Sequence, residues 1–372
     1  MSVPEVPAAA VLRHRVEAHG LSEGSRNGVD VLGAGVRDNP AGVTAPLALL
    51  ARDAEIPDAE VVRAYSIRSA VHAHRVDDIG LLRAALRWRH REDPSEQTYG
   101  PVAATLEDAG TTLPEALDLV VAAMRDVMSA AHGPTKGELS TAVTPLVPPA
   151  VAPWCASCDA HHVNDGLFRH ATLLAGLLVV ADPGRSLRLH MVDAAVADGH
   201  PEQSGAELLR RYVHLAGVAT PAQLATWTGL SRPCVRRWWD QATRELTAVR
   251  VNGTRSWALT DDLDTFADTQ AMDPSVIRLL PAYDPYTEVA DRKLLVPDTA
   301  RRRQVWRALH NPGVIVRDGE IVGVWRDRKS GGGRTVTIEP FDSLAPEEQA
   351  SATADAERLF HTTPVDVGFA EC

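Results

Sequence analysis

Apolar residues in the first third of the chain recur every three or four positions, the spacing of amphipathic helices. Between the first two such stretches, the glycines of VLGAGVRDNPAG and its Asn39-Pro40 step predict a loop over residues 33–40. We therefore predict a mainly helical, winged-helix-like region over residues 1–132. Its helical stretches are VPAAAVLRHRVEAHG, DAEVVRAYSIRSAVHAH, VDDIGLLRAALRWRHR and LPEALDLVVAAMRDVMSAAH.

The next region, residues 133–203, has a similar but less regular pattern. KGELSTAV predicts a short helix before a run of prolines, and DGLFRHATLLAGLLVVA predicts a second helix. An Asp-Pro-Gly turn then precedes SLRLHMV, which we interpret as part of a two-stranded hairpin. Two helices followed by a hairpin predict a second winged-helix-like unit here.

The clearest pattern lies in residues 204–265. A helix ends at Gly217, Thr220 and Ser231 begin two more, and Asn252-Gly253 predicts a tight hairpin. This order indicates a winged-helix unit whose third helix, RPCVRRWWDQA, would enter a DNA major groove. Because Trp238 and Trp239 are adjacent on that helix, we expect only one of them to lie fully in the core.

After residue 275 the pattern changes to short strands. A basic helix, DTARRRQVWRALH, precedes GVIVRD, GEIVGVWRDR and RTVTIEPF, which are separated by glycine-containing turns. We predict a β-rich, barrel-like element over residues 275–345 and an acidic tail over residues 346–372. The expected fold class is α+β, mainly helical, with tandem winged-helix units and a C-terminal β-barrel-like meander.

Charge is segregated along the chain, although the net charge of −11 argues at first against binding nucleic acid. Residues 204–260 hold eight arginines and three acidic residues, and residues 292–334 hold eleven Lys or Arg and four acidic residues. Local fields matter more than the average, so we expect double-stranded DNA as the partner. The alternative is that these charges only solvate the surface.

Composition also bounds the location of the protein. No run of about 18 uncharged apolar residues occurs, so we expect no membrane span. Arg13 follows the start too closely for a secretory signal, and four cysteines in 372 residues do not form a disulfide framework. We expect a cytoplasmic monomer that is associated with the nucleoid when it is bound to DNA.

The candidate DNA-binding residues are mostly arginines, whose planar guanidinium suits phosphates and bases. Arg232, Arg236 and Arg237 lie on the predicted recognition helix, and Arg255 lies on the wing. Arg68 and His72 share a face if their segment is helical, since they are four residues apart. The candidates in the second basic region are Arg292, Arg301, Arg302 and Arg326.

The segment WCASCDAHHV contains a candidate metal site. Cys155, Cys158 and His162 supply three of the four ligands of a structural zinc, and the fourth is not visible in the sequence. The alternative is a tight knuckle whose thiols only pack. No other cofactor is expected, because the chain has no P-loop, dinucleotide fingerprint, H-E-x-x-H or G-x-S-x-G motif.

Several of these segments together resemble the AlkZ-like winged-helix DNA glycosylases over residues 8–345. They are VLGAGVRDNPAG, SIRSAVHAHRVDD, KGELSTAV, CASCDAHHV to GLFRHA, and RLLPAYDPYTEVADRKLLVPD to GVIVRDGEIVGVWR. The resemblance implies tandem winged helices around a basic channel and excision of alkylated or bulky-adducted bases. It also implies hydrolysis of the N-glycosidic bond, with a carboxylate or amide that stabilises an oxocarbenium-like sugar and places water.

The sequence departs from the family's catalytic pattern in the N-terminal loop. The family typically has Gln-aliphatic-Gln or Gln-aliphatic-Asp there, and by position these residues correspond to Gly35-Val36-Arg37. Asp38 is then the candidate catalytic carboxylate, with Asn39 and Arg37 beside it. The alternatives are a catalytically silent DNA-binding protein, such as a lesion sensor or regulator, and a structural protein that does not bind DNA.

Overall fold

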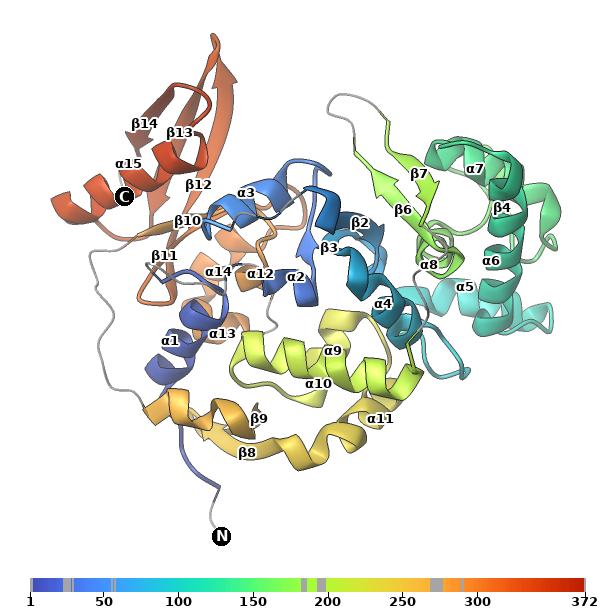
Figure 1. Cartoon of the computed structure of the whole chain (residues 1–372), viewed down its shortest axis with the longest axis horizontal. Helices are drawn as coiled ribbons and strands as arrows, with labels where there is room; N and C mark the ends of the chain where they lie inside the picture. Colours follow the sequence, from blue (N-terminus) through green and yellow to red (C-terminus); the bar gives the residue numbers. More distant parts are fainter. Residues whose placement is uncertain are drawn as a thin grey trace. The chain divides into compact units, whose positions relative to one another are not determined.

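The computed structural model in Figure 1 describes residues 3–22, 28, 30–54, 56, 58–181, 186–192, 199–267, 277–288 and 291–370. Contacts between residues divide the chain into two compact units. The first contains Met1–Ile56, Arg211–Gln223 and Arg244–Cys372, and the second contains Pro57–Arg210 and Leu224–Thr243. Each unit is therefore built from segments that are discontinuous in sequence, whereas the sequence predicted five consecutive segments.

The first unit contains an open five-stranded sheet in the order β10-β11-β12-β13-β14. The first four strands pair antiparallel, and β14 pairs in parallel with β13. Because β10 and β14 lie at opposite edges, the described strands do not close into the barrel-like element that the sequence predicted. The strands are β10 (Arg278–Leu280), β11 (Gly313–Arg317), β12 (Glu320–Ser330), β13 (Gly333–Pro340) and β14 (Val365–Phe369).

The predicted acidic tail is part of this sheet. Residues Pro346–Leu359 form helix α15, which crosses from β13 to the parallel strand β14 and contacts β10 and β14 (Figure 1). Its apolar face buries Ala352, Ala356 and Leu359. The prediction was wrong because it weighed the acidic residues and overlooked these apolar positions at helical spacing.

Most of the remaining elements of the first unit contribute to the same core, where Leu12, Tyr286 and Trp325 are buried together. Hairpin β8–β9 turns at Asn252-Gly253, where both residues have positive φ, as the sequence predicted. The elements are α1 (Ala8–Ala18), α2 (Val31–Ala34), β1 (Val36–Arg37), α3 (Thr44–Leu50), β8 (Leu246–Val251), β9 (Thr254–Leu259), α12 (Pro285–Glu288), α13 (Arg292–Leu295) and α14 (Thr299–Val305).

The second unit packs helices α6 and α8 together and places two antiparallel hairpins, β2–β3 and β6–β7, beside α8. Its capping boxes at Thr112 and Thr135 begin α6 and α7. The elements are β2 (Val61–Tyr65), β3 (Val71–Arg75), α4 (Ile79–Leu86), α5 (Glu96–Asp108), α6 (Leu113–Ala130), α7 (Lys136–Val143), β4 (Trp154–Cys155), β5 (Ala160–His161), α8 (Asp165–Ala175), β6 (Leu177–Val180), β7 (Arg188–Met191) and α11 (Arg232–Ala242).

Two predicted helices of this unit are wrong in whole or in part. The stretch DAEVVRAYSIRSAVHAH forms the hairpin β2–β3, because β-branched and aromatic residues favour strands. The helix predicted over DGLFRHATLLAGLLVVA ends at Ala175, because Gly176 adopts a left-handed conformation and LLVV continues as β6. The predicted Asp-Pro-Gly turn after it lies outside the described residues.

Helices α9 (Pro201–Ala216) and α10 (Pro221–Thr228) each contribute residues to both units. Along the chain, α9, α10 and α11 are followed by β8 and β9, in the order that the sequence predicted. Trp238 and Trp239 are both buried, at 4% and 8% exposure, so the expectation that one would be partly exposed was wrong. Gly205 makes room for Trp238, since a Cβ there would lie 2.2 Å from the indole nitrogen. No helix among the described residues is both long and apolar enough to span a membrane.

Candidate functional site

The loop predicted over residues 33–40 joins α2 to α3 in the first unit. Gly35 ends α2 with φ 94° and ψ 136°, a conformation that residues with a Cβ rarely adopt. Strand β1 then carries Val36 into the core and leaves Arg37 partly exposed. The backbone at position 35 thus turns sharply without a side chain, and Arg37 is the nearest polar group that follows.

Asp38 is held by the backbone of the following turn. Its carboxylate is 2% exposed and accepts hydrogen bonds from the N–H groups of Gly42 at 2.6 Å, Val43 at 3.2 Å and Ala45 at 3.1 Å. The Asn39 N–H donates to the Thr44 hydroxyl at 2.7 Å. Asp38 therefore ties the loop to the start of α3, and its catalytic role stays a prediction.

Arg37 makes the polar contacts that could form a reaction site. Its guanidinium carbon lies 4.3 Å from the centre of the Tyr283 ring, and its Nη1 lies 3.8 Å from a carboxylate oxygen of Glu288. The Arg37 and Glu288 side chains are 26% and 13% exposed. Tyr283 has φ 64°, and such strained positions are found preferentially at functional sites. We call Arg37, Tyr283 and Glu288 the Arg37 cluster.

Buried ion pairing fixes the segment that carries Tyr283 and Glu288. Arg52, just after α3, donates two hydrogen bonds to Asp284, at 2.8 and 2.7 Å, and both side chains are fully buried. The Asp284 carboxylate also accepts from the Tyr286 N–H at 2.9 Å. The bidentate geometry sets the direction of the backbone between Tyr283 and α12.

The last turns of α9 add two polar groups beside α2. Arg211 donates to the Gly33 carbonyl at 3.2 Å, and His214 Nδ1 lies 3.0 Å from both oxygens of Asp262. The hydrogen bond to Asp262 raises the pKa of His214, and the charge of Asp30 adds to the shift. His14 joins this group through a 2.7 Å hydrogen bond to the His214 carbonyl, and burial lowers the pKa of His14.

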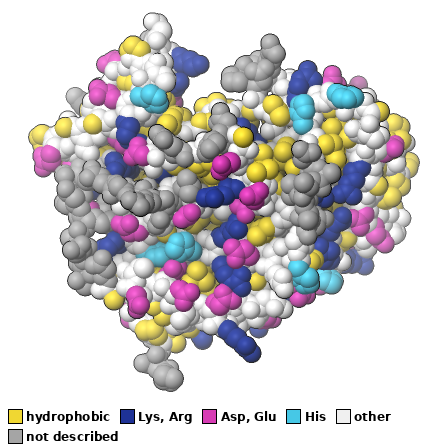
Figure 2. Space-filling view, viewed as in Figure 1, with side chains coloured by type: hydrophobic (Ala, Val, Ile, Leu, Met, Phe, Trp, Pro, Cys, Tyr) yellow, Lys and Arg dark blue, Asp and Glu magenta, His cyan; other side chains and the backbone are white. Residues whose placement is uncertain are grey.

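The predicted DNA-binding residues have very different surroundings. Arg232 and Arg236 are exposed on α11, although Arg236 has Asp240 at 3.7 Å. Arg237 pairs instead with Asp93 and Glu92 of its own unit. On the face drawn in Figure 2, Lys and Arg side chains likewise lie interspersed with Asp and Glu.

The arginines predicted in the first unit also make internal contacts. Arg301 binds Asp342 through two hydrogen bonds, at 2.8 and 2.6 Å, and Arg326 pairs with Glu339 at 3.3 Å. Arg302 donates to nearby carbonyls, while Arg255 and Arg292 lie over the rings of Trp257 and Trp306. Of the predicted set, Arg232, Arg236, Arg255 and Arg292 are exposed.

Arg68 and His72 do not share a helical face, so that prediction was wrong. Arg68 occupies the turn between β2 and β3 with φ 50° and ψ 31°. His72 lies on β3, is 3% exposed, and makes a hydrogen bond through Nδ1 to the Ala70 carbonyl at 3.0 Å. This burial leaves His72 unsuited to direct contact with DNA.

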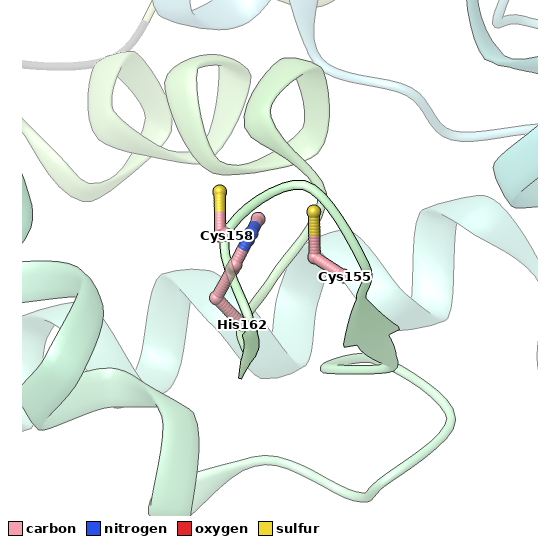
Figure 3. A group of neighbouring side chains, drawn as sticks. All are labelled: Cys155, Cys158 and His162. Carbon is pink, nitrogen blue, oxygen red and sulfur yellow. The ribbon is translucent and has the colours of Figure 1, made fainter.

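The three predicted zinc ligands lie together in the second unit. Cys155, Cys158 and His162 offer Sγ, Sγ and a ring nitrogen that all lie within 4.8 Å of one another (Figure 3). The Ser157 hydroxyl, followed by the Cys158 amide and the His162 ring, lowers the pKa of the Cys155 thiol to about 6. Cys234 is buried on α11, where burial raises its pKa to about 12.

Comparison with known proteins gives the family. A model of the family described as DNA glycosylase AlkZ-like matches residues 45–361, which is most of the chain. The chain belongs to this AlkZ-like family. An interstrand DNA cross-link repair glycosylase of Streptomyces sahachiroi is 32% identical over 133 residues, and this match covers 34% of each protein. The chain therefore matches about a third of the length of this curated relative.

The fold agrees with a solved structure of the same family. The DNA glycosylase AlkZ of Streptomyces sahachiroi superposes with a TM-score of 0.73 at 18% identity, over 98% of this chain and 100% of that chain. This similarity establishes a shared fold across almost the whole molecule.

The Arg37 cluster is the candidate active site because it joins the predicted loop to a partly exposed carboxylate, Glu288. The loop of residues 33–40 precedes the matched residues, whereas Tyr283 and Glu288 lie within them. Sequence reasoning missed both residues, because they are about 250 positions from Arg37 and their contact depends on the tertiary fold. The unusual segment AYDPYTE was noticed only as part of the family resemblance.

Proposed function

We propose that this protein is a DNA glycosylase that removes alkylated or bulky-adducted bases from double-stranded DNA by hydrolysing the N-glycosidic bond. Membership of the AlkZ-like family carries the proposal. The related protein, named an interstrand DNA cross-link repair glycosylase, supports covalently damaged DNA as the substrate. N-alkylation makes the purine cationic, so it leaves readily with the electron pair of the broken bond.

The sugar then develops positive charge at C1′, and a nearby carboxylate would stabilise it. We assign this role to Glu288 in preference to Asp38, because three backbone N–H groups already occupy the Asp38 oxygens. Arg37 would orient Glu288 through the 3.8 Å ion pair. The same ion pair reduces the repulsion between the Arg37 guanidinium and the positively charged sugar. Water adds to C1′ and passes its proton to the carboxylate.

The deciding experiment is single-turnover release of 7-methylguanine, and of a bulky N-alkylated purine, from duplex DNA. We expect release by the wild type and a loss of about 100-fold or more in Glu288→Gln. Glu347→Gln, the same chemical change on exposed α15, is the matched control and keeps the wild-type rate. If Asp38→Asn loses the rate at unchanged thermal stability and Glu288→Gln does not, Asp38 is the catalytic carboxylate.

A catalytically silent DNA-binding protein is the second candidate, because the predicted correspondence places Gly35 and Arg37 at the positions of the family's motif glutamines. Duplex binding by the wild type with no release of either base would establish that reading. Loss of both binding and release would contradict both candidates.

We also propose that α9–α11 with β8–β9 act as a winged helix whose α11 contacts the major groove, and that residues 133–203 form a second such unit. The exposed Arg232 and Arg236 support a DNA-facing α11. We propose further that the protein acts on nucleoid DNA in the cytoplasm as a monomer, which light scattering of the purified protein would test.

A further inference from the structure

The turn between β4 and β5 in the second unit, which we call the knuckle, brings together three side chains that ligate soft metal ions. The chain runs Cys155-x-x-Cys158-x-x-x-His162, and its Cys-x-x-Cys part has the spacing of cysteine pairs in structural zinc sites. Figure 3 shows the three side chains extending from the same side of this turn. Asp159, which has φ 52°, lets the chain reverse between the second cysteine and the histidine.

The distances are close to those of a tetrahedral metal site. With Zn–S near 2.3 Å and Zn–N near 2.0 Å, neighbouring ligand atoms in a tetrahedron lie about 3.3–3.8 Å apart. The three donor atoms of the knuckle lie within 4.8 Å of one another. A contraction of about 1 Å, to which rotation of the exposed Cys158 side chain can contribute, would bring them to ligand distances.

The orientation of His162 distinguishes this cluster from a chance grouping. Its Nδ1 makes a 2.8 Å hydrogen bond with the Val163 carbonyl, so Nδ1 carries the proton and Nε2 keeps its lone pair. The Nε2 atom is buried and makes no regular hydrogen bond to the described residues. A backbone carbonyl that fixes the tautomer in this way is the usual second partner of a metal-binding histidine.

The neighbouring histidine points elsewhere, as the alternation of a strand requires. His161 bonds through Nδ1 to the Ala152 carbonyl at 3.2 Å, and its ring lies 5.3 Å from the Trp154 ring. It is therefore excluded from the cluster, although it is the same residue type one position away.

We propose that Cys155, Cys158 and His162 bind one Zn²⁺, with the fourth coordination position filled by water. Two thiolates and an imidazole favour Zn²⁺ over Mg²⁺ or Ca²⁺, which prefer oxygen ligands. The ion would tie the two strands of the knuckle together immediately before Asn164, which caps α8. This proposal is independent of the proposed glycosylase function.

The test is metal content of the full-length protein purified under reducing conditions and supplied with Zn²⁺, measured by mass spectrometry after removal of free ions. We expect one zinc per chain in the wild type and in His161→Ala, the matched control. Cys158→Ser and His162→Ala should lose it. Co²⁺ in place of Zn²⁺ should give the thiolate charge-transfer band of a cysteine-bound metal, and His161→Ala should keep this band.

Two results would overturn the proposal. One is a wild type that binds no more zinc than Cys155→Ser/Cys158→Ser, while thiol titration shows both cysteines reduced. The other is equal zinc in wild type and His162→Ala, which would remove the histidine from the site. Circular dichroism identifies a variant that fails to fold, and the cobalt spectrum of the wild type still decides the question in that case.

Discussion

Single residues in the N-terminal loop differ sharply in what their side chains do. Asp38, the carboxylate that the sequence singled out, bonds to the backbone, whereas Arg37 meets Tyr283 and Glu288. Adjacency in sequence was a poor guide here, because β1 ends at Arg37 and the Asp38 carboxylate is taken up by the backbone of the following turn. The Asp38 side chain therefore stabilises the loop, whereas the Arg37 side chain contacts the other residues of the candidate active site.

Replacing Asp38 by alanine should cost stability first. The substitution leaves three backbone N–H groups buried without their acceptor, each worth about 1 kcal/mol or more. We expect the free energy of unfolding to fall by about 3 kcal/mol, measured by urea denaturation. Glu288→Gln should change it by less, by about 1 kcal/mol, since its ion pair with Arg37 is long at 3.8 Å and glutamine keeps the size of the side chain. Equal stability of Asp38→Ala and wild type would show that the backbone bonds are not maintained.

At the scale of elements, α8 contains a buried histidine that makes stability depend on pH. His170 stacks on Trp88, with ring centres 4.3 Å apart, and Nε2 bonds to the Leu86 carbonyl. Burial lowers the pKa of His170 to about 4. The unfolded chain therefore binds this proton more readily, so stability falls as the pH drops from about 6.5 towards 4.

We predict that His170→Gln removes this part of the acid sensitivity. Between pH 7 and pH 5, His170 should lower the free energy of unfolding of the wild type by about 2 kcal/mol. The variant lacks this contribution, so its total loss over the same pH range should be smaller by about 2 kcal/mol. Urea denaturation at both pH values measures the difference. Identical pH dependence in the two proteins would mean that His170 is not held in its neutral form.

The link between α3 and α12 depends on the buried pair of Arg52 and Asp284. Removing one partner leaves an unpaired charge in the core, so Asp284→Ala should destabilise by about 3–5 kcal/mol. Arg52→Met with Asp284→Leu removes both charges and should recover part of that loss. Thermal denaturation of the single and double variants tests this, and a double variant less stable than Asp284→Ala would contradict it.

The sequence predicted the elements that have strong local signals. Helices α1, α6 and α7 and the hairpin β8–β9 follow from amphipathic spacing, capping residues and Asn252-Gly253. It was wrong at β2–β3, where the choice between helix and strand depends on packing against α8 and β6. Helix α5 was missed because Gly100-Pro101 interrupts it. In the candidate site, the sequence predicted Arg37. It did not predict Tyr283 and Glu288, because their contact with Arg37 depends on the tertiary fold.

At the scale of the whole molecule, counting basic residues in the sequence overestimates how many of them are available to bind DNA. Local counts of arginine do not show that Arg301, Arg326 and Arg237 have acidic partners in the fold. The basic character of each segment is thus partly neutralised by residues from elsewhere in the same unit. Arg232 and Arg236 on α11 are exposed and remain candidates for contact with a phosphate backbone.

Salt dependence of duplex binding should report this difference. Each phosphate contact adds about 0.9 to the slope of log affinity against log salt concentration. We expect Arg232→Ala/Arg236→Ala to reduce the magnitude of the slope by roughly 2, while Arg301→Ala leaves it nearly unchanged. Fluorescence anisotropy over a range of salt concentrations measures both. A larger change for Arg301→Ala would place the phosphate contacts on α14.

The discontinuous make-up of the two units limits how such a protein can evolve. The chain passes between them at Ile56, Arg210, Gln223 and Thr243, so neither unit corresponds to one stretch of gene. A recombination event that replaces either end of this gene would leave the first unit incomplete, because that unit combines residues 1–56 with residues 244–372. The architecture should therefore be inherited whole, and lineages should diverge by point substitution within a fixed frame.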